Sequence, residues 1–343
     1  VWGPSFSMAI PPGWTTKRTF SEIPLPAGIA PENIKSMSAS YTNLVLLTKS
    51  GDVYITTGSN PSGNAASYGD GSTVIDKEWH KANISQVASI KINSYAQAFA
   101  VTHSGKLYTW GPLVYLGDGI PPKTQYLPTK MTLPSSITKV KMTAFTNGAG
   151  ATYFVLGEDK RVYSLGGGNA GILGVNSTIA SNIWQTVKSP SGDGAGTGTG
   201  YLENIKFITA TLHDNTAGAA GAIDEDGVPY LWGENGASRL GAPGGTPVPL
   251  PRVPDGITPG FHNVIAVEMG GHVTPIIDKR LGKFGYIGHK TSGSMGIPGE
   301  GTITEYDFEN TPEVDFCNII IGNRKKMRVT VNPMNINTTV KKE

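Results

Sequence analysis

The sequence has a single cysteine, Cys317, and only 16% of its 343 residues are charged. One cysteine cannot form an intrachain disulfide, so packing must stabilise the fold, and Cys317 beside Phe316 is interpreted as a small buried hydrophobe. No stretch approaches about 18 consecutive apolar residues, so no membrane span is expected. Apolar stripes with helical periodicity are missing as well, which predicts few and short helices.

The charges are nearly balanced, with 28 lysines and arginines against 26 aspartates and glutamates. Binding to nucleic acid depends mainly on neutralising phosphates and requires a basic face. The basic run at 324–328 is interpreted as a strand edge or hairpin turn, so no nucleic-acid partner is expected. The chain begins at Val1 without a methionine or an apolar leader, and we expect a soluble protein processed or excised from a longer one.

Motifs for catalysis are missing too. The carboxylates at 224–226 lie in an expected hairpin turn and lack the spacing of a calcium loop. No Gly-x-Ser-x-Gly elbow and no glycine-rich loop ending in Gly-Lys-Ser or Gly-Lys-Thr occurs. The histidines fall singly, without the spacing of a zinc site: His80, His103, His213, His262, His272 and His289. We therefore predict no enzyme activity, no catalytic residue, no metal and no cofactor.

The chain does contain a repeat. Five short segments share a glycine or aspartate turn, an apolar residue near a tyrosine, and a closing glycine; the clearest copies end in Trp110-Gly111 and Trp232-Gly233. Their tyrosines lie 54 to 67 positions apart: Tyr54, Tyr108, Tyr163, Tyr230 and Tyr286. Repeats of roughly 40 to 50 residues or slightly more, built from short strands, are typical of propeller blades.

Each repeat has a matching first half. An apolar run precedes each copy, at 35–48, 87–102, 140–156, 205–223 and 264–277, and predicts two strands followed by a tight turn. Every unit therefore reads as strand, strand, turn, strand. A loop rich in asparagine and glycine follows, and then a Leu-Gly step or its equivalent, where glycine lets the chain reverse.

These motifs resemble the repeat of the regulator of chromosome condensation (RCC-like) family, in degenerate form and over nearly the whole chain. WD40 repeats fit less well because no Trp-Asp pair closes a strand, and kelch repeats because the double glycine occurs in place only at Gly166-Gly167. The histidine that the family often carries before its second strand is replaced by Tyr41, Tyr95 and Asn147. The resemblance implies a β-propeller, chromatin binding, and guanine-nucleotide exchange on a small GTPase.

The two ends of the chain predict ring closure. Trp2-Gly3 matches the end of a third strand, while 318–331 matches two opening strands that lack such an end. We therefore predict one all-β domain over 1–343, a propeller of about six blades closed by pairing of the N- and C-terminal strands, which leaves no exposed sheet edge. The expected blades are 34–84, 85–136, 137–203, 204–262, 263–317, and a composite of 318–343 with 1–33.

Loops on this frame are the expected recognition sites. The longest insertion, 189–200, is rich in glycine, serine and threonine and is flanked by aromatic residues; 59–68 and the proline-rich 243–259 are further candidates. Plain connecting loops remain the alternative for all three. The candidate partner contacts are Trp184, Tyr201, Tyr68 and Tyr115.

Three functions are compatible with these features. The first is a non-enzymatic interaction scaffold in a virion, such as a bacteriophage tail or fibre protein that contacts virion proteins or a host surface receptor; the low charge and the many Gly, Thr, Ser and Asn residues favour it. The second is the exchange factor that the resemblance implies. The third is a carbohydrate-binding or carbohydrate-active propeller, which would need two carboxylates about 5 to 10 Å apart. The expected location is the virion or the extracellular space, with the cytoplasm as the alternative.

Overall fold

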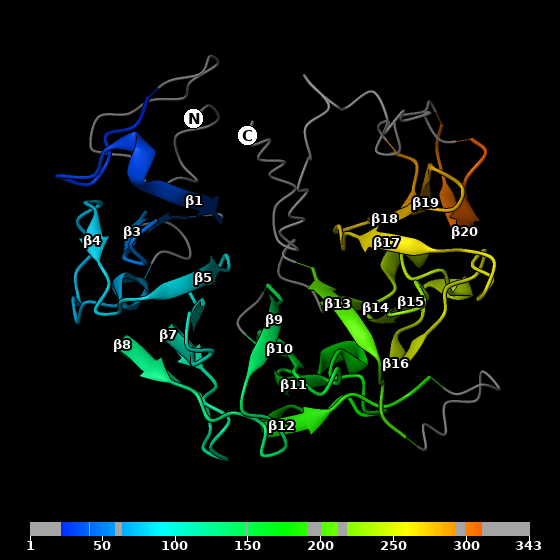
Figure 1. Cartoon of the computed structure of the whole chain (residues 1–343), viewed down its shortest axis with the longest axis horizontal. Coiled ribbons are helices and arrows are strands. Elements are labelled where there is room, and N and C mark those ends of the chain that lie inside the picture. The colour runs from blue at the N-terminus through cyan, green and yellow to red at the C-terminus, as the bar shows by residue number, and fades with distance from the viewer. Residues whose placement is uncertain are drawn as a thin grey trace.

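The computed structural model describes residues 22–40, 42–58, 64–147, 150–190, 200–211, 218–291 and 299–310. Within them the chain forms five antiparallel sheets of four strands, each built from strands consecutive in the sequence. The sheets follow one another around a central axis, with the first strand of each nearest the axis (Figure 1). This is a β-propeller, as the repeat predicts, and each sheet is one blade.

The strands of the five blades have the following bounds. Blade 1 holds β1 (Ile34–Ala39), β2 (Asn43–Thr48), β3 (Val53–Thr57) and β4 (His80–Lys81); blade 2 holds β5 (Val87–Ile92), β6 (Ala98–Thr102), β7 (Leu107–Val114) and β8 (Lys123–Lys130). Blade 3 holds β9 (Val140–Phe145), β10 (Thr152–Gly157), β11 (Val162–Gly166) and β12 (Ser181–Thr186); blade 4 holds β13 (Ile205–Ala210), β14 (Ala219–Asp224), β15 (Pro229–Gly233) and β16 (Val248–Arg252). Blade 5 holds β17 (Val264–Val267), β18 (Val273–Asp278), β19 (Lys283–His289) and β20 (Thr302–Asp307).

Helical structure within the described residues is limited to five 3-10 turns, η1 (Pro31–Asn33), η2 (Ala65–Tyr68), η3 (Asn169–Gly171), η4 (Gly236–Ser238) and η5 (Pro243–Gly245). None is long enough to cross a bilayer.

A fourth strand at the outer edge of each blade differs from the predicted three-strand unit. These strands are exposed or half-buried along most of their length and lack a clean apolar alternation; β8, for example, is mostly exposed, and β12 is mostly half-buried. Pro128 in β8 and Pro249 in β16 are tolerated because an edge strand needs no ladder bond on its open side. The outer strands therefore lack the apolar alternation that predicts the inner strands, because they face solvent and two of them contain proline.

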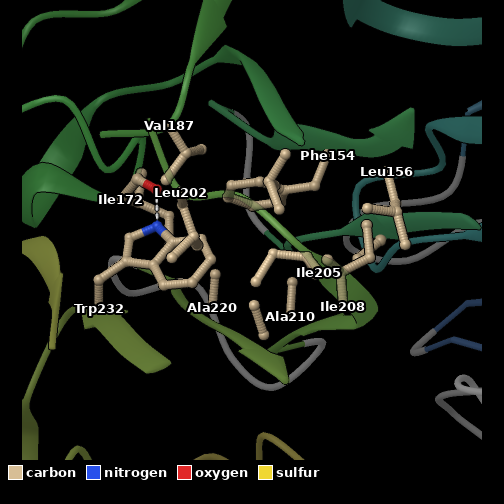
Figure 2. Packing of buried hydrophobic residues seen from close by; sticks show 13 residues of the cluster. Phe154, Leu156, Ile172, Val187, Leu202, Ile205, Ile208, Ala210, Ala220 and Trp232 are labelled. Carbon is tan, nitrogen blue, oxygen red and sulfur yellow. Dashed lines mark hydrogen bonds between the residues drawn. The ribbon is translucent and has the colours of Figure 1, made fainter. Parts of the chain in front are cut away.

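The hydrophobic core lies between the blades. Four apolar clusters each combine residues of two consecutive blades. Between blades 3 and 4, Phe154 and Leu156 of β10 face Ile205 and Ile208 of β13, with Trp232 beside them (Figure 2). Each blade therefore buries its apolar face only when the next blade is present, as in other repeat proteins.

A tryptophan indole joins neighbouring blades at two equivalent positions. Trp110 Nε1 donates to Ser67 O of blade 1 at 2.8 Å, and Trp232 Nε1 donates to Ile172 O of blade 3 at 2.8 Å (Figure 2). Both side chains are fully buried. At the interface of blades 2 and 3, the tryptophan that joins the blades is Trp184 of the outer strand β12, which donates to Thr132 O at 2.6 Å.

The glycine that closes the third strand in blades 2 to 5 is required by its backbone, whereas blade 1 has Thr57 at the equivalent position. Gly111 has φ +112°, and a Cβ there would lie 2.3 Å from Ala96 O. Gly288 in blade 5 has φ +107°, and a Cβ would lie 2.1 Å from His272 O. No L-residue with a side chain fits this crossing of two backbones, which explains why the Trp-Gly or equivalent step recurs.

Ring closure concerns residues outside the described part. Of the predicted composite blade, only 22–33 is described; it contains η1 and no strand. The predicted pairing of Trp2 with the 318–331 strands therefore stays a prediction.

Replacing Trp110 or Trp232 with alanine should cost about 3–5 kcal/mol of unfolding free energy, because a large buried side chain and its inter-blade hydrogen bond are lost together. Denaturant unfolding measures this. Half-buried Trp79, replaced by phenylalanine, is the control; it loses one hydrogen bond to Pro24 O and should change the stability by only about 1 kcal/mol. Parent-like stability of both alanine variants would show that the indoles do not hold the blades together.

Candidate binding surface

The four predicted contact residues lie in different environments. Tyr68 and Tyr115 are buried in the inter-blade clusters, so their rings pack inside the propeller and do not face a partner. Trp184 is half-buried against the same interface. Tyr201 is 50% exposed and lies under the Arg161 guanidinium, 5.3 Å from its ring centroid. Of the four residues, only Tyr201 is exposed, and its contact with a partner stays a prediction.

The three predicted recognition loops are described only in part. Residues 191–199 and 59–63 lie outside the described residues. The third loop, 243–259, contains η5 and the edge strand β16, and so is more ordered than a plain connection. Its Pro249 packs against Gly171 of blade 3, where a Cβ on Gly171 would lie 2.4 Å from the proline.

The innermost strand of every described blade carries a β-bulge at the same place. In blade 1, Ile34 and Ser36 pair with consecutive residues of β2, so the residue between them has no partner across the ladder. The other four blades show the same shift one residue after the start of the inner strand. The unpaired residues are Lys35, Ala88, Lys141, Lys206 and Ile265. Bulges of this kind re-aim a side chain and are common next to functional sites.

Three of the five bulge residues are lysines. They occur at the second position of β1, β9 and β13, next to the hairpins that join the second and third strands. The inner strands lie nearest the axis (Figure 1), and the bulge occupies the same register position near the start of each, so the bulge residues lie at one end of the five inner strands. We call Lys35, Lys141, Lys206, Ala88 and Ile265 the bulge ring.

The amines of the bulge ring make few hydrogen bonds among the described residues. Lys35 Nζ donates to Ala88 O of the next blade at 2.7 Å. Lys206 Nζ donates to Glu225 O at 3.1 Å. Each ammonium carries three donors, so both keep donors for a ligand.

A carboxylate already lies in this positive environment. Glu225, in the blade 4 hairpin, pairs with Lys160 at 3.0 Å. The pKa of Glu225 is lowered, first by the hydrogen bond from Lys160 and its charge, and further by the charges of Lys206 and Lys141. The lysines around Glu225 therefore favour the ionised form of this carboxylate.

Sequence reasoning missed this ring. The signal was present, because β1, β5, β9 and β13 each contain one lysine and none of the five inner strands contains a carboxylate. Alternation shows only that a strand exists, whereas a bulge depends on how that strand pairs with its neighbour. The three lysines could have been aligned across the units, but their common unpaired position could not have been recognised.

The fourth inner-strand lysine is buried. Lys91 of β5 is 8% exposed, and burial lowers its pKa to about 7, against a smaller opposing effect of the Glu268 charge. Glu268 follows β17 in blade 5, so these two residues interact between non-adjacent blades. Lys91 is therefore a poorly solvated amine near the axis.

A histidine with two carboxylates resembles catalytic machinery at the edge of blade 1. His80 Nδ1 lies 2.6 Å from Asp70 Oδ2, and Nε2 lies 2.9 Å from Asp76 Oδ1. The imidazole stacks on Tyr68 with a centroid separation of 3.7 Å. Both ring nitrogens are occupied, so neither has a free position for a substrate proton, and we assign the group a structural role.

Electrostatics agree with that role. Burial alone would lower the pKa of His80, but the hydrogen bonds from its ring to Asp70 and Asp76 raise it above the ordinary value. Backbone donation from Glu78 and the contact with His80 lower the pKa of Asp76. No cluster of three or more metal-ligating side chains occurs within the described ranges.

Comparison with solved structures identifies the fold. Human WBSCR16 superimposes with a TM-score of 0.61 at 16% identity, covering 81% of this chain and 67% of that chain. Yeast RCC1 (Prp20) bound to Kap60 gives 0.56 at 15% identity, covering 82% and 64%. Prp20p from Saccharomyces cerevisiae gives 0.53 at 16% identity, covering 72% and 56%.

The chain thus spans less than two thirds of the two yeast chains. No protein-family model and no curated protein matches the sequence. At these identities the likeness establishes the fold alone: the chain is a β-propeller whose fold is similar to that of the RCC1-like proteins.

Replacing His80 with glutamine should destabilise the protein mainly in mild acid. A raised pKa in the folded state means that His80 contributes stability below its unfolded pKa of about 6.5, and that this contribution is lost as the pH rises through the folded pKa. The difference in melting temperature between parent and variant should be larger at about pH 5.5 than at about pH 8.5. A difference that does not change with pH would contradict the paired imidazolium.

Replacing Lys91 with methionine should have the opposite pH dependence. A lowered pKa means that the buried charge destabilises the fold below about pH 7, and that the penalty declines as the pH rises toward about 10. The variant should therefore melt above the parent at about pH 6, with the gap narrowing above about pH 8. Exposed Lys49→Met is the matched control, and a variant less stable than the parent at pH 6 would contradict a poorly solvated amine.

Proposed function

We propose that this chain is a non-enzymatic, protein-binding scaffold. The observation that supports the proposal most directly is the RCC1-like propeller itself, since solved propellers of this kind are described with protein partners. Prp20p is reported with binding properties to Gsp1p and histones, and yeast RCC1 (Prp20) is seen bound to Kap60.

The frame suits recognition because it holds its surface loops in place. Val87 N–H donates to Gly51 O at 3.0 Å, which ties the blade 1 hairpin to the inner strand of blade 2. The same bond ties blades 4 and 5, where Val264 N–H donates to Gly227 O at 2.9 Å. A surface ordered before binding loses less entropy when a partner docks.

At the opposite end of the blades, a buried arginine also stabilises the propeller. Arg239 is 2% exposed and donates from Nη1 to Gly270 O at 3.2 Å and from Nε to Glu234 O at 3.1 Å. It also pairs with the Glu234 carboxylate. This arginine therefore joins the η4 turn of blade 4 to the loop between β17 and β18, and its donors are used within the fold.

We further propose that the partner is a component of a virion or a host surface receptor. The support is compositional: 45 glycines and only 16% charged residues in 343. Exchange-factor activity on a small GTPase is the alternative that the RCC1-like fold favours.

Three assays decide between these functions. Cross-linking with mass spectrometry on the native source, followed by reconstitution with the purified partner, should give a saturable complex with the intact chain. Fractionation of particles should place the chain with the virion; a chain found only in the soluble fraction contradicts that location. Acceleration of nucleotide release from small GTPases would favour exchange activity, and the lack of any saturable protein complex would contradict the scaffold.

A further inference from the structure

We propose that the bulge ring is a docking site for an acidic segment of a partner protein, whose carboxylates are bound by Lys35, Lys141 and Lys206. This inference rests on the proposed protein-binding function and specifies where and how the partner binds.

Placement supports the site. The three lysines occupy one structural position in blades 1, 3 and 4, because the bulge recurs at the same point of each inner strand. A residue in a bulge has no partner across the ladder, so its side chain is not fixed by cross-strand pairing. Blades radiate from a common axis, so equivalent positions form a ring and not a stripe (Figure 1).

Unused donors supply the binding chemistry. Lys35 and Lys141 are exposed and Lys206 is half-buried. Within the described part of the chain, Lys35 and Lys206 each donate to one backbone carbonyl, and Lys141 makes no hydrogen bond from Nζ. Charge-assisted bonds from an ammonium to a carboxylate are roughly twice as strong as neutral ones.

The charges of two ring lysines already act on a carboxylate of the chain. Glu225 lies beside the ring, is paired with Lys160, and has a lowered pKa that reflects the additional charges of Lys206 and Lys141. A carboxylate supplied by a partner would meet the ammonium groups of Lys141 and Lys35 directly. Lys139, exposed just before β9, adds a further positive charge.

The other two ring positions suggest that the segment also carries apolar residues. Ala88 is half-buried, and Ile265 is 45% exposed in the bulge of blade 5. An exposed isoleucine next to a charged surface would be covered by an apolar side chain of the partner. The segment that fits is therefore acidic with interspersed apolar residues.

The charge distribution favours a protein over a nucleic acid. Affinity for nucleic acid grows with the number of phosphates neutralised, so it is served by a continuous basic stripe. The ring presents three separated amines, and the basic residues of the blade 3 hairpin are already paired, Lys160 with Glu225 and Arg161 with Glu203. Spaced carboxylates on a peptide match this arrangement better than an unbroken phosphate chain.

The test uses a fluorescent 12-residue peptide of alternating glutamate and leucine, its glutamine analogue, and single-stranded DNA of similar length. Titration by fluorescence anisotropy compares the parent with the triple variant Lys35→Gln, Lys141→Gln, Lys206→Gln. The control triple variant is Lys49→Gln, Lys106→Gln, Lys279→Gln, which removes the same charge from exposed hairpin lysines of blades 1, 2 and 5. Melting temperatures check that all variants fold.

The ring variant should lose about tenfold or more in peptide affinity, and the control less than about threefold, because only the ring amines contact carboxylates directly. The glutamine peptide should not bind measurably. Equal losses in the two variants, no binding of the acidic peptide to the parent, or tighter binding of DNA than of the peptide would each overturn the proposal.

The partner obtained by cross-linking separates this proposal from the one it rests on. If that partner binds the ring variant as tightly as the parent, the scaffold function stands and the ring is not the docking site. If no partner binds the parent, the scaffold function itself fails.

Discussion

The propeller depends on apolar burial between successive blades, and at three interfaces a tryptophan indole also donates a hydrogen bond to the preceding blade. Trp110 and Trp232 are fully buried, and their hydrogen bonds satisfy carbonyl groups that would otherwise be left in an apolar interface. Because each cluster is shared by two blades, no blade has a complete core alone. Stability is therefore a property of neighbouring pairs, and the surfaces that face away from those pairs are free to vary.

Much of this frame could be predicted from the sequence, and the reason is steric. Gly111 and its equivalents sit where a Cβ would collide with a carbonyl, so glycine recurs at the end of third strands even where the tryptophan has become Leu165 or Ile287. Inner strands were recognisable because half-buried strands alternate. The outer strands escaped prediction because β4 has only two residues and β8 is mostly exposed, which leaves no periodic pattern to detect.

The polar sites were harder to predict because they depend on contacts across the chain. His80 is one of six histidines scattered singly, yet the fold brings Asp70 and Asp76 to its two nitrogens. His262 Nδ1 likewise lies 2.8 Å from Asp278 Oδ2 in the buried edge of blade 5. Aromatic residues next to loops were poor guides to binding, since Tyr68 stacks on His80 inside blade 1 and Tyr115 is enclosed between blades 2 and 3.

The bulge position recurs in every described blade and has no partner across the ladder. Its backbone is held in place, while its side chain can be substituted. The bulge is fixed by the ladder on both sides of it, yet its own side chain has no partner opposite, so substitutions there cost little packing. Lysine at three such positions and alanine or isoleucine at the others is consistent with that freedom. In each unit, the residues that stabilise the blades and the residues that remain available to a partner occupy different positions. A repeat fold can therefore acquire a ring of charged residues at the end of its axis without altering the cores between its blades.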